Sequence, residues 1–160
     1  MKSSTPSCNS STQSSRLTRD QMLMGLAHVA AARGTCNRLS VGAVLVLENR
    51  PISLGYNGAP PGHDHCGSDC NKDNPCKNTI HAEENAINWA KKFLDNPHLE
   101  EMTLYVTDSP CIACAWIISK AGIKRVVYDR EYRVTDGIDL LKRIGIEVSQ
   151  CHVNLAISAN

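Results

Sequence analysis

The chain has 160 residues, a net charge of +1, 42% hydrophobic residues and 21% charged residues. This length and composition are typical of one globular domain that can bury a core without disulfides. The near-neutral charge argues against a long polyanion such as nucleic acid as the main partner. A small phosphorylated ligand stays compatible with it, because such a ligand needs only one or two cations.

The two ends of the chain differ from its middle. The first 16 residues hold nine Ser or Thr residues and no apolar segment like that of a secretory signal peptide. We therefore expect a disordered tail over residues 1–17, with a transit peptide as the alternative, a single domain over 18–151 and a C-terminal tail over 152–160. No run of about 18 apolar residues occurs, so neither a membrane span nor a membrane partner is predicted.

A cytoplasmic location follows from the same features. In a reducing compartment, the eight cysteines are more often metal ligands than disulfides.

The first half of the chain predicts a helix, a hairpin and a second helix. The first helix begins near Thr18, because Gln21 completes a capping box with it, and ends at Gly34. Apolar runs at 41–47 and 52–56, joined by a turn at 48–51, predict an antiparallel hairpin. Glycine and proline in 57–62 predict a loop. The second helix is expected over 81–94, with Asn78 or Thr79 as its cap.

In the second half, strands alternate with helices. Strands are predicted over 102–107, 124–128 and 146–149, and helices over 111–121 and 136–144. Crossovers of this length join parallel neighbouring strands. The prediction is an α/β domain of three layers, α/β/α, with one mixed five-stranded sheet and helices on both faces.

Two short runs carry the chemistry: His81-Ala82-Glu83 and Pro110-Cys111-Ile112-Ala113-Cys114. Two cysteines three residues apart at a helix start place both thiolates on one side of its first turn, where the free N–H groups favour the charged form. His81 can supply a third ligand. Three protein ligands leave one position of a tetrahedral zinc open, as in catalytic sites, and Glu83 is positioned to move a proton. The alternative is a structural zinc site in a non-catalytic module, with Glu83 as a solvated helix acid.

Residues 63–78 contain almost nothing apolar, so the hydrophobic effect gives them no reason to be ordered. A bound metal is the natural clamp for such a segment. It carries five metal-ligand side chains: His63, His65, Cys66, Cys70 and Cys76.

The two catalytic runs match the signature H-x-E followed by P-C-x-x-C of zinc deaminases. The chain resembles the cytidine and deoxycytidylate deaminase superfamily over about residues 20–150, most closely its deoxycytidylate (dCMP) deaminases. Gly55-Tyr-Asn-Gly-Ala-Pro60 is the run most particular to the dCMP branch. The other runs that carry the resemblance are Cys36 with Val41-Gly-Ala-Val44, His81-Ala-Glu-Glu-Asn-Ala-Ile87, Leu104-Tyr-Val-Thr107 and Ala121-Gly-Ile-Lys-Arg-Val-Val-Tyr128.

The resemblance implies a cytidine deaminase-like fold with strand order 2-1-3-4-5. It implies a catalytic zinc on His81, Cys111 and Cys114, with Glu83 as the proton shuttle. The implied reaction is hydrolysis of dCMP to dUMP and ammonia, which supplies dUMP for thymidylate synthesis. A related deaminase acting on dCTP, cytidine or another nucleobase is the alternative.

The resemblance also implies substrate and effector contacts. Asn57 is expected at the deoxyribose, with a turn-forming Asn as the alternative, and Arg38 and Tyr132 at the phosphate and the base. Family members are often homohexamers that dCTP activates and dTTP inhibits, with Mg²⁺ on the nucleotide phosphates.

Some dCMP deaminases carry a second zinc outside the active site. Here four thiolates would make a closed site of the structural kind: Cys36, Cys66, Cys70 and Cys76. A histidine, His63 or His65, is an alternative to one of these cysteines, while a disulfide or free thiols are alternatives to the metal. Cys8 and Cys151 are expected to be free thiols.

Overall fold

The computed structural model describes residues 16–67, 70, 78–94 and 98–154. Residues 1–15 and 155–160 of the two predicted tails, and Cys76, lie outside the described residues. The predicted domain boundaries therefore stay predictions.

The described elements alternate along the chain as the sequence predicts. The strands form one sheet of order β2-β1-β3-β4-β5, which is antiparallel across β2, β1 and β3 and parallel across β3, β4 and β5. The predicted mixed sheet and its strand order are confirmed. The elements are α1 (Arg19–Ala31), β1 (Gly42–Leu47), β2 (Arg50–Tyr56), α2 (Ala82–Phe93), the short 3-10 helix η1 (Leu99–Glu101), β3 (Thr103–Asp108), α3 (Ile112–Ala121), β4 (Arg125–Arg130), α4 (Asp136–Arg143) and β5 (Glu147–Gln150).

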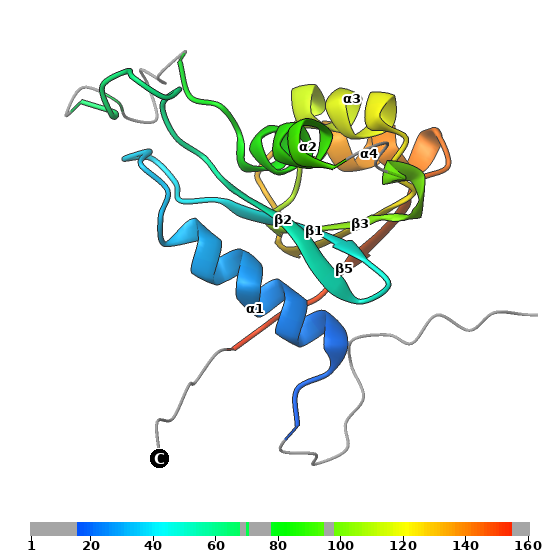
Figure 1. Ribbon diagram of the computed structural model, residues 1–160. Coiled ribbons are helices and arrows are strands. Elements are labelled where there is room, and N and C mark those ends of the chain that lie inside the picture. The colour runs from blue at the N-terminus through cyan, green and yellow to red at the C-terminus, as the bar shows by residue number, and fades with distance from the viewer. Residues whose placement is uncertain (1–15, 68–69, 71–77, 95–97, 155–160) are drawn as a thin grey trace, which may run out of the picture.

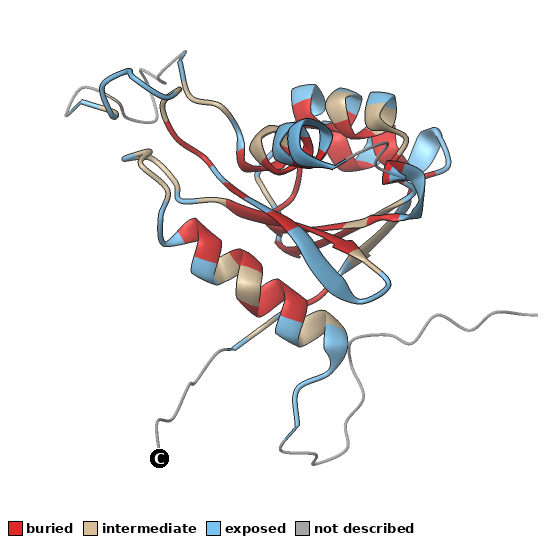
Figure 2. Cartoon of the chain, in the orientation of Figure 1, coloured by how far each residue is buried: buried red, intermediate tan, exposed pale blue. Residues whose placement is uncertain are grey.

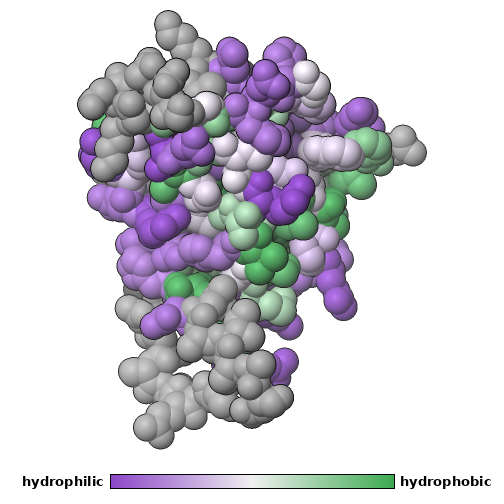
Figure 3. Space-filling model, turned by 90° about the vertical axis from the view of Figure 1, so that its left-hand side faces the viewer, coloured by the Kyte–Doolittle hydropathy of each residue, from purple (hydrophilic) through white to green (hydrophobic). Residues whose placement is uncertain are grey.

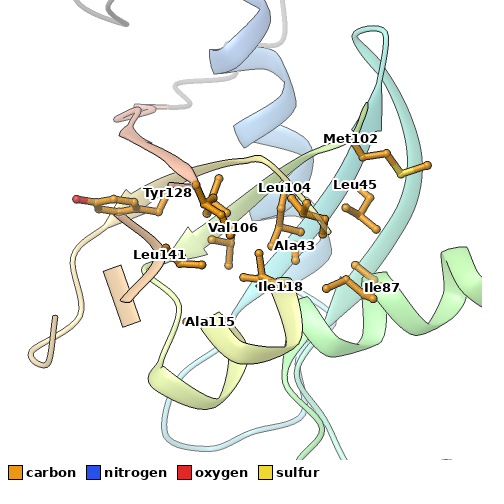
Figure 4. Close-up of a cluster of buried hydrophobic side chains, with 14 of the residues drawn as sticks. Ala43, Leu45, Ile87, Met102, Leu104, Val106, Ala115, Ile118, Tyr128 and Leu141 are labelled. Atoms are coloured by element: carbon orange, nitrogen blue, oxygen red, sulfur yellow. The ribbon is translucent and has the colours of Figure 1, made fainter. Parts of the chain in front are cut away.

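Helices cover both faces of the sheet (Figure 1). Helices α2, α3 and α4 lie on one face and α1 on the other, so two apolar clusters form. The buried residues follow the strands and the helix sides turned toward them (Figure 2). In the larger cluster, Leu104 and Val106 of the central strand lie near Ile118 of α3 (Figure 4).

Local chemistry explains where several elements begin and end. The Thr18 side chain accepts from the Gln21 N–H and the Gln21 side chain accepts from the Thr18 N–H, so the predicted capping box starts α1. Glu48 and Asn49 have positive φ values of 47° and 63°, as a two-residue hairpin turn requires. The turn is therefore tighter than predicted, and β2 begins at Arg50.

The predicted cap of α2 is wrong. Neither Asn78 nor Thr79 caps the helix, since its N-cap residue is His81 and no side chain makes a capping bond. The reason is a non-local pairing: Ile80 and Gly58 exchange backbone hydrogen bonds of 2.9 and 3.1 Å in an isolated bridge. This bridge holds residue 80 against the loop after β2, so the helix begins at Ala82 with His81 as its N-cap residue.

A close backbone approach fixes α2 against β2. A side chain at Gly55 would overlap the Ala82 carbonyl oxygen, so only glycine fits there. Two residues earlier in β2, on the same face of the sheet, the Ser53 hydroxyl donates a hydrogen bond to the Ala86 carbonyl over 2.7 Å. The first turn of α2, which holds Glu83, is thereby held firmly on the sheet.

The state of Cys151 differs from the prediction. Cys151 is disulfide-bonded, so its prediction as a free thiol is wrong. Spacing along the chain does not determine which cysteines meet in the fold.

Within the described ranges, no helix combines the length and the apolar character needed to cross a membrane.

Candidate active site

Three metal-ligand side chains converge where α2 and α3 begin. His81 is the N-cap residue of α2, Cys111 is the N-cap residue of α3, and Cys114 lies in the first turn of α3. The Nδ1 atom of His81 lies 3.6 Å from the Cys111 sulfur and 3.3 Å from the Cys114 sulfur. A tetrahedral zinc with ordinary Zn–N and Zn–S bonds requires about 3.5 Å between such atoms. This donor set therefore fits zinc with one coordination position left open.

The pKa values of the three side chains are shifted in different directions. A hydrogen bond from the Cys114 thiol and another from His81 lower the pKa of Cys111 to about 3. The same contact with Cys111, together with burial, raises the pKa of Cys114. The hydrogen bond to Cys111 raises the pKa of His81 to about 9. In the metal-free protein at neutral pH, the trio thus consists of a thiolate, a thiol and an imidazolium.

Glu83 lies beside the trio without belonging to it. Its side chain is only 4% exposed, and this burial raises its pKa. Its carboxyl group interacts electrostatically with His81 and Cys111 and forms a hydrogen bond with Cys114. Among the described residues, the ligand group at this point contains His81, Cys111 and Cys114 alone. Glu83 is thus placed to exchange protons near a metal rather than to bind it.

A cavity of about 340 Å³ opens beside this trio. The sequence-predicted contacts Arg38, Asn57 and Tyr132 all line it. So do two polar residues that the sequence analysis missed, Asp108 and Ser109. The signal for them was their place at the carboxyl end of β3, directly before Pro110, because functional side chains gather at that edge of parallel strands. The full lining is Cys36, Arg38, Leu39, Val41, Asn57, Thr79, His81, Ala82, Glu83, Asp108, Ser109, Cys111 and Tyr132.

Asn57 connects the cavity wall to the backbone. Its Oδ1 accepts a 2.9 Å hydrogen bond from the Val41 N–H, and its Nδ2 donates to the Leu39 carbonyl over 2.7 Å. Each amide atom retains capacity for one more bond. Asn57 therefore fixes the segment before β1 and can still contact a ligand.

Ser109 and Asp108 form hydrogen bonds that stabilise the cavity wall on the side of Tyr132. The Ser109 hydroxyl accepts from the Tyr132 N–H over 2.8 Å. One oxygen of Asp108 accepts from the Thr107 hydroxyl at 2.7 Å and from Arg130 at 2.9 Å. A hydrogen bond with Arg133, and a weaker interaction with Arg38, lower the pKa of Tyr132. These bonds hold Tyr132 at the cavity, within reach of Arg38.

Three of the four cysteines predicted for a second site also come together. The sulfur atoms of Cys36, Cys66 and Cys70 all lie within 4.8 Å of one another. Burial raises the pKa of Cys66 to about 11. His63 and His65 are exposed, and neither belongs to this ligand group. The cluster is therefore built of thiols as far as the described residues extend.

Comparisons with known proteins agree with this geometry. The family model for the cytidine and deoxycytidylate deaminase zinc-binding region matches residues 17–130. The deoxycytidylate deaminase of Mycobacterium phage D29 is 38% identical over 125 residues, covering 70% of this chain and 94% of that protein. ComE operon protein 2 of Bacillus subtilis strain 168 is 39% identical over 142 residues, covering 87% of this chain and 74% of that protein.

Among solved structures, the dCMP deaminase from the cyanophage S-TIM5 in complex with dCMP and dUMP is similar, with a TM-score of 0.71 and 36% sequence identity. The match covers 79% of this chain and 92% of that one. The motifs, the fold, the converging ligands and these similarities agree, and the chain belongs to the zinc-binding family of cytidine and deoxycytidylate deaminases.

Proposed function

We propose that the chain is a zinc-dependent deoxycytidylate deaminase, which hydrolyses dCMP to dUMP and ammonia and so supplies dUMP for thymidylate synthesis. The observation that carries the proposal is the cavity itself, since its wall includes Glu83, the cation Arg38 and two of the three zinc ligands, His81 and Cys111. A guanidinium at that place suits a substrate phosphate. The phage D29 relative is a deoxycytidylate deaminase, and the cyanophage neighbour binds dCMP and dUMP.

In this proposal His81, Cys111 and Cys114 would hold a zinc ion, which when bound would supply a water activated for attack at neutral pH. As the water oxygen adds to the ring carbon, the Glu83 carboxylate takes one of its protons and delivers it to the neighbouring ring nitrogen. Glu83 then takes the proton of the added hydroxyl and delivers it to the amine. The carbon–nitrogen bond breaks, ammonia leaves, and the hydroxyl oxygen becomes the carbonyl oxygen of the product. The burial of Glu83 keeps its proton away from bulk solvent.

Three residues of the cavity wall are proposed to bind the nucleotide. Arg38 pairs with the phosphate, Tyr132 lies at the base side, and Asn57 uses its remaining donor and acceptor for the deoxyribose. All three residues line the same cavity, which supports their contact with one ligand.

Arg38→Gln tests the substrate assignment. We expect the KM for dCMP to rise about 10- to 100-fold, the effect of one charge-assisted hydrogen bond, while kcat changes little. With deoxycytidine, which lacks the phosphate, the variant and the parent should be alike. Ammonia release measures both substrates. Arg33→Gln is the control, because Arg33 is exposed and does not line the cavity.

A substrate panel separates the proposal from its alternatives. Equal kcat/KM for dCMP and deoxycytidine, or a preference for dCTP or cytidine, would assign the chain to another branch. Binding of dUMP without ammonia release from any of these nucleotides would indicate a non-catalytic zinc module.

We further propose a second, structural zinc on Cys36, Cys66, Cys70 and Cys76, the last of which lies outside the described residues. Support comes from the sulfur atoms of the first three, which lie within 4.8 Å of one another, near the spacing of about 3.8 Å in tetrahedral zinc thiolates. We expect two zinc ions per chain by metal analysis. One ion per chain would instead favour the disulfide or the free thiols, which a thiol titration then distinguishes.

A cytoplasmic homohexamer that responds to dCTP, dTTP and Mg²⁺ completes the proposal. The resemblance motivates the effectors, and adding each nucleotide with Mg²⁺ to the assay tests them.

Self-association has support in an apolar surface on β2 and α2, where Leu54, Trp89 and Phe93 are each more than half exposed. The Trp89 and Phe93 rings there stack with their centroids 4.4 Å apart. Apolar side chains are also visible on the face seen in Figure 3. The mass in solution by light scattering decides the assembly.

A further inference from the structure

One turn of the chain belongs both to the cysteine cluster and to the cavity. Cys36 is a member of the cluster, together with Cys66 and Cys70. It also lines the cavity, and so does Arg38, two residues further on. Cys66 and Cys70 do not line the cavity. The segment 36–39 is therefore the place where a change in the cluster can reach the substrate cavity.

The segment 36–39 is held at both ends. At its start, the Cys36 sulfur lies within 4.8 Å of the Cys66 and Cys70 sulfurs. Burial raises the pKa of the Cys36 thiol, but the nearby backbone N–H groups of Leu39 and Arg38 lower it on balance. The next carbonyl in the segment, that of Leu39, accepts the Asn57 amide. Arg38 thus lies between Cys36, which belongs to the cluster, and Leu39, which Asn57 of the cavity wall holds in place.

Residues outside the cavity also hold the Cys36 sulfur in place. The Cys36 sulfur contacts that of Cys66, which in turn contacts Cys70. Asn37 adds a second link, since its Nδ2 donates to the carbonyls of Cys66 and Gly67 at 3.2 and 2.9 Å. Residues 36–39 are therefore fastened to the segment around Cys66 by Asn37 and by the cluster sulfurs, and Asn37, Cys66 and Cys70 do not line the cavity.

We infer that the cluster of Cys36, Cys66 and Cys70 positions Arg38 for the substrate phosphate, so that zinc on these thiols sets the affinity for dCMP. The inference rests on the proposed function. In it, Cys66 and Cys70 are positioning residues that act through Cys36 and the backbone at Arg38. Zinc bound by these thiols would fix the position of the Cys36 sulfur, and with it the segment 36–39 that carries Arg38.

The variant Cys70→Ser tests the inference, because Cys70 lies outside the cavity. We expect one zinc ion fewer per chain, a KM for dCMP raised about tenfold and a kcat within about twofold of the parent. The kinetics with deoxycytidine should not change. The control is Asp64→Asn in the same loop, because this exposed residue lies outside the ligand group and should match the parent throughout.

A double-mutant cycle with Arg38→Gln isolates the coupling. If Cys70 acts through Arg38, the two substitutions together raise the KM for dCMP no more than Arg38→Gln alone. If the effects multiply instead, the cluster acts by another route and the inference is wrong.

Hydrogen exchange separates this inference from the proposed function. Without any substrate, Cys70→Ser should speed amide exchange at residues 38 and 39, while exchange in β3 stays as in the parent. If the parent protein is inactive on dCMP, the proposed function is wrong. The exchange measurement still tests whether the cluster holds residues 36–39 in place. Loss of one zinc with unchanged exchange and unchanged KM for dCMP overturns the inference.

If Cys70→Ser does not fold, Asn37→Ala replaces it. This variant removes the two side-chain links to Cys66 and Gly67 and leaves every thiol in place. Faster exchange at residues 38 and 39 supports the inference, and unchanged exchange overturns it.

Discussion

Glu83→Gln should reduce the kcat for dCMP by about 10²- to 10⁴-fold, which is the usual contribution of a positioned general acid–base group. Glutamine has the same shape but cannot accept the proton of the attacking water or return it to the leaving amine. Because Glu83 stands outside the ligand group, the variant should keep the zinc content of the parent. Ammonia release and metal analysis on the same sample measure both quantities.

The matched control is Glu84→Gln. Glu84 carries the same functional group one residue further along the first turn of α2 but does not line the cavity, so its kcat should stay within about twofold of the parent. A Glu83→Gln protein with full activity and full zinc would defeat the proposed mechanism. Lost activity together with lost zinc would instead make Glu83 a residue needed for metal binding.

Zinc uptake by the active site should release about two protons per ion at pH 7. Zinc requires a neutral imidazole and two thiolates. In the metal-free protein, the pKa of His81 is about 9 and that of Cys114 is raised, so both hold a proton, while Cys111 is already a thiolate because its pKa is about 3. The zinc-bound state thus binds fewer protons, and high pH favours it. The affinity should fall about 100-fold for each unit by which the pH drops below 8.

Calorimetric zinc titrations in buffers of different ionisation enthalpy count these protons. The Cys70→Ser background confines uptake to the active site, if the second zinc exists as proposed. Above pH 9 the release should fall toward one proton, because His81 is then already neutral. Release of no proton at pH 7 would contradict the unequal sharing of charge among the three side chains.

The ligand trio was predictable because its chemistry is local. Cys111 and Cys114 stand one helical turn apart, and their helix start follows from Pro110 and the preceding strand. His81 and Glu83 share another helix start. The sequence therefore predicts the residue types, the spacing and the helices on which they lie, and the family carries a zinc-binding region over these positions. The mixed sheet was predictable for a similar reason, since connection lengths limit which strands can be parallel.

Several features depend on contacts between distant parts of the chain, and the sequence misses them. The N-cap of α2 is His81 and not Asn78 or Thr79, because Ile80 pairs with Gly58. The disulfide of Cys151 depends on which cysteines meet in space. Ser109 enters the cavity wall by binding the Tyr132 backbone, 23 residues away. None of these contacts leaves a periodic or spaced pattern that a single sequence can display.

The sequence by itself determined the chemistry of this protein: a metal on two thiolates and an imidazole, with a carboxylate beside it. It determined these because a helical turn places side chains three residues apart on one side. Only the tertiary structure decided that Arg38 shares a cavity with that chemistry, and that Cys36 joins this cavity to the cluster with Cys66 and Cys70. The physical reason is that the sheet and its close backbone contacts bring the turn before β1 against the starts of α2 and α3, which the chain separates by more than 40 residues.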